Sequence, residues 1–234
     1  MIKKIIQGCS ILLPPILLIW MTVAEFSYGA VASILVVVLA LVPFFLEFER
    51  QKPRPRDLVP IAVMSAIGAL GRALFAAVPS FKPTSAIVII TGMQFGPQAG
   101  FLTGTLSALA SNMFLGQGPW TPWQMYAWGI MGYVAGWLEQ KGAFQYRTFL
   151  YSYGLMAGVL FGWFMNLWYV VGYVRPITAT TIFIAYGSSM VMDMAHGIST
   201  VLFLVILEKP WGKKLKRLKF KYGICNHGGD DECT

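Results

Sequence analysis

The sequence has few charged residues, cysteines and histidines, and each shortage excludes a class of protein. Asp, Glu, Lys and Arg make up 12% of its 234 residues, about half of the ~25% that is usual in soluble domains. The three cysteines, Cys9, Cys225 and Cys233, fit neither a disulfide framework nor a zinc site. The sequence has no Walker motif and no convincing nucleophile elbow, so we do not expect this chain to hydrolyse ATP itself.

Apolar residues dominate the chain instead. They account for 56% of it, and the mean hydropathy is +0.62. This composition predicts an all-α integral membrane protein, and the length suffices for about six to eight helices of ~20 residues each. The net charge of +8 does not indicate nucleic-acid binding, because the positive residues cluster in loops between apolar segments and not on one soluble face.

The apolar segments divide the chain into three parts. Residues 1–50 are expected to form an extra N-terminal pair of transmembrane helices. The first lies within residues 1–22 and is kinked at Pro14–Pro15, and the second spans Ala30–Leu46. A signal peptide is the alternative for the first segment, although no clear cleavage site follows it. Residues 51–209 are expected to form a six-helix core. Its predicted spans are 58–78, 84–95, 99–114, 125–138, 149–173 and 181–207.

Residues 210–234 form the third part, a basic tail. An amphipathic helix is predicted to begin at Pro210, with Trp211, Leu215, Leu218 and Tyr222 on one stripe and lysines on the rest of its surface. Such a helix lies at the membrane surface, where anionic headgroups attract it. The polar residues after Asn226 are predicted to be disordered.

The distribution of positive charge predicts the topology. With the N- and C-termini both cytoplasmic, 15 of the 18 Lys and Arg residues lie inside, Lys82 and Arg175 lie outside, and Arg72 lies within a span. This asymmetry follows the positive-inside rule and requires an even number of spans. It places the loops at 78–83, 114–124 and 173–181 together on the outer face of the cell membrane.

The stretch from Lys82 to Gln124 organises the core. Two apolar segments, joined by Gly96-Pro97-Gln98, are rich in Gly, Ala, Ser and Thr, which let helix backbones approach closely in lipid. The loop that follows, Leu115 to Gln124, holds two prolines and two tryptophans. This arrangement favours a ligand platform, with a tight helix pair capped by an interfacial tryptophan anchor as the alternative.

The predicted span at 58–78 carries a stripe of small residues. Ala62, Ala66, Ala69 and Ala73 recur at spacings of four, three and four and so share one helical face. They predict either a docking surface for another helix or packing inside the bundle. Arg72, near the end of the same span, should face a partner, a cavity or the interface, because a charge in lipid costs at least ~2.5 kcal/mol.

Aromatic and amide residues gather at the predicted outer face. They suit a large, partly polar organic ligand, although Trp and Tyr also serve as interfacial anchors. The candidate ligand-binding residues are Lys82, Asn112, Gln117, Trp120, Trp123, Gln124, Asn166, Tyr169, Arg175 and Asp193, with Trp168 and Tyr186 beside them. Asp193 and His196 are three apart, and two such ligands are too few for a metal site. We expect them to form a hydrogen-bonded pair or to line the ligand cavity.

Four features together resemble a known family. They are Ala62 and Ala66, the Lys82-Pro83-Thr84 entry, the Gly-Pro-Gln-Ala-Gly turn at 96–100, and the Gly-Gln-Gly-Pro-Trp-Thr-Pro-Trp-Gln loop at 116–124. They are similar to the substrate-binding (S) component of energy-coupling factor (ECF) transporters, over roughly residues 57–207. The loop at 116–124 looks most like S components associated with cobalamin uptake. The two N-terminal helices depart from the six-span pattern of this family.

The resemblance implies a vitamin-uptake subunit that binds its ligand at the outer face and is not itself an enzyme. It implies partners in an ECF module, namely a transmembrane coupling protein and two ATPases that use ATP, and it assigns Ala62, Ala66, Ala69 and Ala73 to the coupling protein. It also implies that the subunit topples in the membrane to carry the ligand across. This chain would bind no cofactor and no metal. There are three alternatives: an S component for another vitamin, an intramembrane enzyme using Asp193 and His196, and an assembly factor without an outer cavity.

Overall fold

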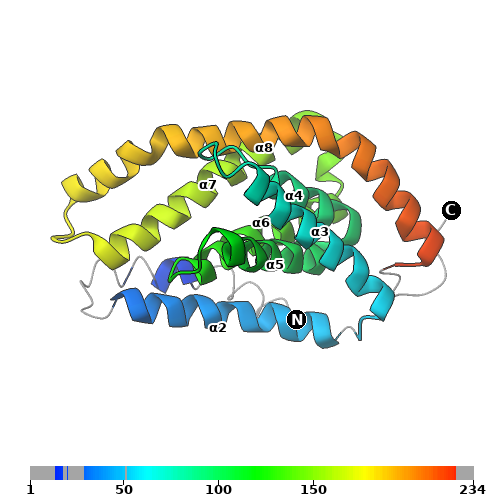
Figure 1. The fold of residues 1–234 in the computed structure, drawn as a ribbon, viewed down its shortest axis with the longest axis horizontal. Coiled ribbons are helices and arrows are strands. Elements are labelled where there is room, and N and C mark those ends of the chain that lie inside the picture. The colour runs from blue at the N-terminus through cyan, green and yellow to red at the C-terminus, as the bar shows by residue number, and fades with distance from the viewer. Residues whose placement is uncertain (1–13, 18–19, 21–28, 51, 225–234) are drawn as a thin grey trace.

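The computed structural model describes residues 14–17, 20, 29–50 and 52–224, and every regular element among them is a helix. Most of the first predicted span lies outside the described residues. The elements are α2 (Gly29–Arg50), α3 (Pro55–Leu74), α4 (Thr84–Phe95), α5 (Pro97–Leu115), α6 (Thr121–Gln140), the 3-10 helix η1 (Ala143–Gln145), α7 (Arg147–Tyr173) and α8 (Ala179–Tyr222). The all-α prediction is confirmed (Figure 1).

Three of the described helices, α3, α7 and α8, are long and apolar enough to cross a membrane by length and composition. The predicted number of two plus six spans stays a prediction. Helices α4, α5 and α6 pack against one another at the centre, α3 covers α5, and α7 and α8 form a long pair (Figure 1). Helix α2 runs along the opposite side of the bundle and contacts α5, α6 and α7.

Glycines bring the three central helices into direct backbone contact. A Cβ atom at Gly100 of α5 would lie 2.7 Å from the Cα atom of Gly92 in α4, and one at Gly136 of α6 would lie 2.5 Å from the nitrogen of Pro97. Gly132 of α6 faces the carbonyl group of Gly100 at similarly close range. No larger residue fits these positions, so the small residues of the hairpin set the distances between the central helices.

Helix α4 matches the predicted span 84–95, but it is short. Its 12 residues rise only about 18 Å, less than the ~30 Å of a bilayer core. Ten of them are buried, including Thr84, Ser85 and Thr91. The surrounding helices therefore shield α4 from lipid along its length, and its polar side chains bond inside the protein, as Thr91 does to the carbonyl group of Ile87 (2.8 Å).

Helix α6 begins earlier than predicted. The sequence pattern placed Thr121–Gln124 in a loop, whereas the structure places them in the first turn of α6, with Pro122 near its start. Proline suits this position, because it has no N–H group to leave unpaired and its fixed φ matches a helix. The loop between α5 and α6 is thereby reduced to residues 116–120.

The prediction of a separate tail helix beginning at Pro210 is wrong. Helix α8 continues without interruption for 44 residues and passes through Pro210. Its last part turns toward the start of α3 (Figure 1), as expected where a proline removes a backbone hydrogen bond. The stripe predicted for the tail is only partly exposed. Leu215 is buried in the core and Trp211 packs against it, whereas Leu218 and Tyr222 are exposed.

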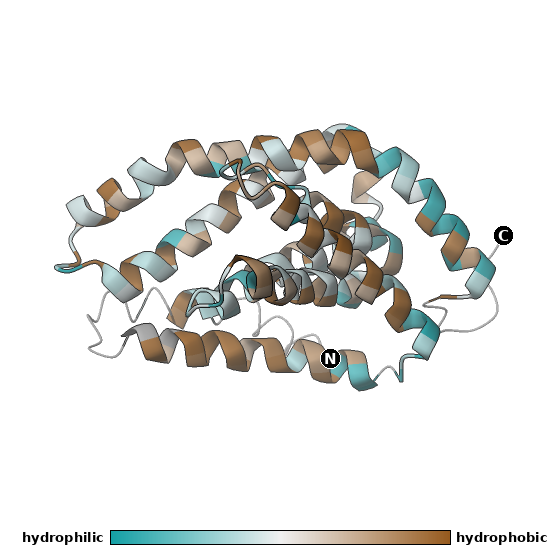
Figure 2. Cartoon of the chain, viewed as in Figure 1, coloured by the Kyte–Doolittle hydropathy of each residue, from teal (hydrophilic) through white to brown (hydrophobic). Residues whose placement is uncertain are grey.

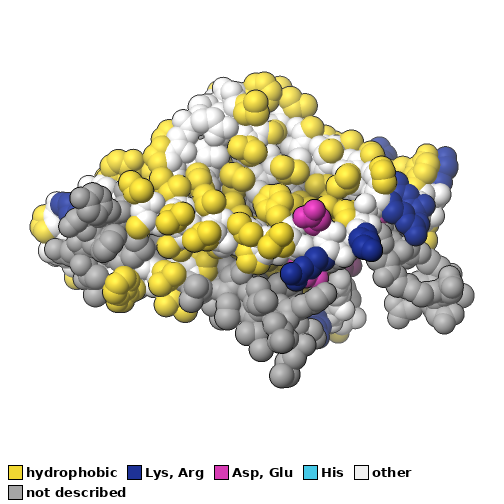
Figure 3. Space-filling model, turned by 90° about the horizontal axis from the view of Figure 1, so that it is seen from below, with side chains coloured by type: hydrophobic (Ala, Val, Ile, Leu, Met, Phe, Trp, Pro, Cys, Tyr) yellow, Lys and Arg dark blue, Asp and Glu magenta, His cyan; other side chains and the backbone are white. Residues whose placement is uncertain are grey.

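The two ends of the bundle differ in charge. We call the end formed by residues 50, 52–57, 94–98, 136–147 and 208–224 the basic end, and the end formed by residues 75–83, 112–126 and 163–178 the aromatic end. Hydrophobic side chains cover much of one face of the molecule, while Lys and Arg gather toward the basic end (Figure 3). Helix α8 also becomes more hydrophilic toward the basic end, in its last turns (Figure 2).

Close packing at Gly132 can be tested by adding one methyl group. Gly132→Ala forces a Cβ atom against the Gly100 carbonyl group, and we expect it to cost about 1–3 kcal/mol of stability. Gly187→Ala is the matched control, because this helical glycine has open space around it and alanine is the better helix former. Thermal unfolding of the purified protein in detergent should show a lower Tm for the first variant only. Equal Tm values for both variants would contradict the packing described here.

Candidate functional site

A buried polar network begins at Arg72, near the aromatic end of α3. The side chain is only 8% exposed, and its Nη1 atom donates hydrogen bonds to the Oγ atom of Ser111 (2.7 Å) and the Oδ1 atom of Asn112 (2.5 Å). The Nδ2 atom of Asn112 in turn donates to Thr121 (2.9 Å) and Gln124 (2.8 Å). The network joins α3, the end of α5 and the first turn of α6. Arg72 therefore faces polar partners, one of the environments expected for a charge within a span.

Trp128 extends this network to α4 and α8. The guanidinium carbon of Arg72 lies 5.1 Å from the centre of the Trp128 ring, a cation–π geometry. The Nε1 atom of Trp128 donates to the Oγ atom of Ser85 (3.0 Å), and a hydrogen bond of 2.8 Å joins that oxygen to Nε2 of His196. Phe161 stacks on Trp128 and meets His196 edge-on. Six helices, α3 to α8, are thus tied together by one continuous chain of polar and aromatic contacts.

Lys82 lies beside this network, in the loop before α4. Its backbone N–H group donates to the Oγ atom of Ser199 in α8 (2.9 Å), and its side chain is half-buried. Burial lowers the pKa of Lys82, and the charge of Arg72 lowers it further. The charges of Lys82 and Arg72 therefore act on each other near the aromatic end.

Aromatic side chains connect the start of α6 to the end of α7. Trp120 meets Trp168 edge-on at 6.1 Å, and Trp168 meets Tyr173 at 5.3 Å. Deeper in the protein, Trp123 packs on Phe164 at 5.0 Å. The Trp123 side chain is fully buried, and its Nε1 atom has no hydrogen-bond partner among the described residues. An unpaired buried donor costs stability, so an acceptor that reached this N–H group would stabilise it.

Asn166 and Asp193 form a second polar cluster, between α7 and α8. The Oδ2 atom of Asp193 accepts hydrogen bonds from Ser189 (2.9 Å) and from Asn166 (3.1 Å), which also donates to Ser189 (2.5 Å). A Cβ atom at Gly162 would lie 2.5 Å from Cγ of Asp193. Glycine at this position therefore makes room for the carboxyl group between the two helices.

The expected pairing of Asp193 with His196 is wrong. Although the two residues lie three apart on α8, Asp193 bonds to Ser189 and Asn166, whereas His196 bonds to Ser85. Among the described residues, no group of three or more His, Cys, Asp and Glu side chains is arranged to hold a metal ion.

The structure sorts the other predicted ligand-binding residues into three groups. Asn112 and Gln124 join the Arg72 network, and Gln117 reaches it by accepting a hydrogen bond from Thr121 (2.9 Å). Tyr169 is half exposed and stacks on Tyr173. Arg175 is exposed and donates to the carbonyl oxygens of Val174 and Val171, so it caps the end of α7, which it follows.

Several residues of these polar networks were not among the ligand-binding residues predicted from the sequence. Ser85 and Trp128 gave no signal in the sequence, because a serine and a tryptophan in an apolar helix are common. Arg72 did give one, since a charge within a span needs partners, but the partners could not be named from spacing.

The alanine stripe is only partly at the surface. Ala62 and Ala66 are exposed on α3, next to the exposed Val59 and Val63, and Ala73 is half-buried. Ala69 is 2% exposed, so its assignment to a partner surface is corrected, because it packs inside the protein. The four alanines span only about 60° of the helix, and Ala69 lies at the edge of this stripe next to the buried Ser65 and Arg72, where α3 packs on α4 and α5.

Comparison with known proteins identifies relatives. A family model described as "ECF-type riboflavin transporter, S component" matches residues 53–217, more than half of the chain. A UPF0397 protein of Vibrio atlanticus (strain LGP32) is 33% identical over 86 residues, which cover 35% of this chain and 47% of that protein. The match therefore spans about half the length of this relative. No solved structure matches the chain significantly.

Ser85 is the group that joins the two halves of the network, and its removal is informative. Ser85→Ala leaves Nε1 of Trp128 and Nε2 of His196 without this partner, at ~1–3 kcal/mol for each unsatisfied group. We expect the Tm in detergent to fall by about 5 °C or more. Ser188→Ala is the control, because Ser188 is exposed and bonds only to the carbonyl group of Ala185 in its own helix. Similar Tm values for the two variants would show that the network does not stabilise the bundle.

Proposed function

The chain belongs to the S-component family of ECF-type riboflavin transporters, and from this premise we propose that it binds a vitamin at the aromatic end and delivers it with an ATP-driven module. The observation that carries the proposal is the aromatic end itself. There the rings of Trp120, Trp123 and Trp168 adjoin a network of amide and guanidinium groups. Flat rings and neutral hydrogen-bonding groups suit a heteroaromatic ligand with a polar rim.

Riboflavin is the first candidate for the ligand. Its flat ring system can stack on the partly exposed rings of Trp120 and Trp168, and its polar rim can bond to the nearby polar network. A corrinoid such as cobalamin is the second candidate, favoured by the sequence of the loop at 116–124. The family description names riboflavin, which puts it ahead of the corrinoid.

The partners follow from the family. We propose that a transmembrane coupling protein and two ATPases supply the energy, and that Ala62 and Ala66 meet the coupling protein. These alanines are exposed between the apolar side chains of Val59, Val63 and Leu70, which gives a smooth surface for a second helix. The cytoplasmic side is proposed to be the basic end, in line with the positive-inside rule, so that the aromatic end faces outward.

An intramembrane enzyme is the weaker alternative. Asp193 and His196 do not act as a pair, since each bonds to a different set of side chains. Ser85 and His196 are hydrogen-bonded, but both are fully enclosed by α4, α6 and α8. A reaction would need a substrate to reach them, whereas the rings of Trp120 and Trp168 at the aromatic end are partly exposed.

Ligand binding can be tested on the purified protein. Mass spectrometry of the small molecules that leave with it identifies the natural ligand, and titration calorimetry compares riboflavin with cobalamin. Trp168→Ala removes a ring from the aromatic end, and we expect affinity to fall about 10- to 100-fold, as when one stacked aromatic contact is lost. Trp137→Ala, which removes a half-exposed ring near the basic end of α6, should leave affinity unchanged. Failure of both vitamins to bind, with no molecule retained, would refute the proposal.

Docking can be tested separately from binding. Ala66→Trp places a bulky ring on the exposed face of α3, and we expect it to abolish vitamin uptake by cells while the purified protein still binds ligand. Val191→Trp is the control, because Val191 is an exposed side chain on α8, away from α3. Uptake by the Ala66→Trp variant at the control level would show that this face does not meet the coupling protein.

A further inference from the structure

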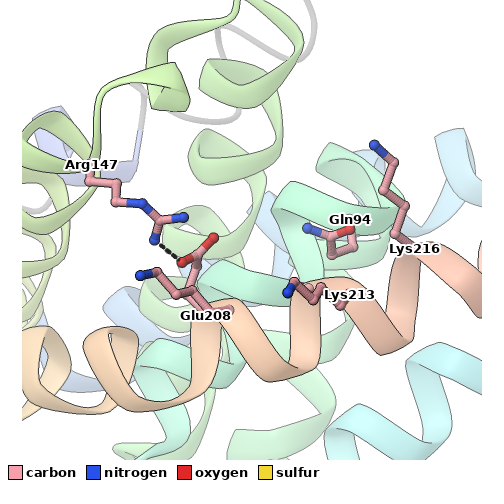
Figure 4. Close-up of a pocket in the computed structure, with 7 residues that line it drawn as sticks. Gln94, Arg147, Glu208, Lys213 and Lys216 are labelled. Atoms are coloured by element: carbon pink, nitrogen blue, oxygen red, sulfur yellow. Dashed lines mark hydrogen bonds and ion pairs between the residues drawn. The ribbon is translucent and has the colours of Figure 1, made fainter.

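A pocket of about 230 Å³ lies at the basic end, far from the aromatic rings described above. It is lined by Gln94, Arg147, Glu208, Lys209, Gly212, Lys213 and Lys216 (Figure 4). Neither the family match nor the proposed vitamin site accounts for it. Three elements meet there, namely the end of α4, the start of α7 and the second half of α8.

The sequence of α8 directs several cationic side chains to this pocket. Lys209, Lys213 and Lys216 are spaced by four and three residues, so they share one face of the helix. Gly212, on the same face, adds no side chain and leaves room beside Gln94. In Figure 4, Lys213 and Lys216 flank the Gln94 amide, while Arg147 reaches toward Glu208 from α7.

The charges of the pocket do not cancel. Arg147 is paired with Glu208 in an ion pair, and Glu139 lies close enough to influence Lys216. Within the part of the chain that the structure describes, no carboxylate lies within ion-pair distance of Lys209, Lys213 or Lys216. Four cations thus face two carboxylates, and the neutral amide of Gln94 adds a hydrogen-bond donor. Such a set matches an anion that offers several acceptor oxygens.

The surroundings of the pocket place it at the level of lipid headgroups. The apolar helix α4 ends at Phe95 and α7 starts at Arg147, at the same end of the bundle. Just beyond the pocket on α8, Phe220 and Tyr222 are 58% and 50% exposed, and lysine ammonium groups lie over both rings. Exposed aromatic rings and lysines on one amphipathic helix are typical of the membrane–water interface.

We propose that this pocket binds the phosphate group of an anionic membrane lipid, with Lys213 and Lys216 as its principal cationic contacts and Gln94 as a neutral donor. Arg147, held by Glu208, closes the side of the pocket toward α7. Basic pockets between transmembrane helices on the cytoplasmic side recognise anionic headgroups in this way. The bound lipid would join the inner ends of α4, α7 and α8. The proposed lipid site does not require vitamin binding, so the two proposals can be tested separately.

The test compares two double variants that remove the same charge from the same helix. Lys213→Gln with Lys216→Gln empties the pocket of two cations, whereas Lys214→Gln with Arg217→Gln removes two exposed cations that do not line it. The full-length protein is reconstituted with phosphatidylglycerol or phosphatidylcholine, and retained lipid is measured by native mass spectrometry. We expect the pocket variant to bind phosphatidylglycerol about tenfold more weakly and the control to change less than twofold. Neither variant should alter retention of phosphatidylcholine.

Inorganic phosphate distinguishes the two sources of the same chemical group. If the site takes a lipid, millimolar phosphate added to the detergent-solubilised protein should neither protect it thermally nor displace phosphatidylglycerol. Displacement by inorganic phosphate would overturn the lipid assignment in favour of a soluble phosphate. Equal loss of phosphatidylglycerol from both double variants would overturn the pocket itself, because the attraction would then be diffuse.

Discussion

Direct contact between the backbones of α4, α5 and α6 is the constraint on which the rest of this structure depends. In a bilayer, burying apolar surface between helices gives little net gain, so close packing has to hold them together. Gly92, Gly100 and Gly132 provide it by letting the helices meet without side chains between them. The short helix α4 can therefore sit at the centre, and its Ser85 hydroxyl comes within reach of α6 and α8.

Sequence patterns predicted the helices of this central unit well. The segments at 84–95 and 99–114 correspond to α4 and α5 within two residues at each end, because Gly96 and Pro97 fix the turn. The start of α6 and the continuity of α8 were missed for one reason. Pro122 was placed in a loop and Pro210 at the start of a tail helix. Proline is, however, favourable in a first turn, and in a helix supported by packing it bends the helix without ending it.

Composition predicted the chemistry of the candidate site, but spacing could not predict its connections. Aromatic and amide residues at the predicted outer loops do lie near one another, as Trp120 and Trp168 or Asn112 and Gln124 show. The partner of each side chain depends on how far each helix is rotated about its axis, which the surrounding packing decides. Asn166 and Asp193 therefore form a cluster of their own between α7 and α8, and His196 turns to Ser85 in α4.

The two ends of the bundle use positive charge in different ways. Arg72 is enclosed by Ser111, Asn112 and the ring of Trp128, all of them neutral, so its charge is fixed in position and acts on whatever lies nearby. The lysines of the basic end are exposed and available to headgroups. Under the proposed function, a subunit that reorients in the membrane would have to break and remake headgroup contacts at the basic end. Its glycine-packed centre, and with it the charged network, could meanwhile move as one body, because direct contacts between its own helices hold it together.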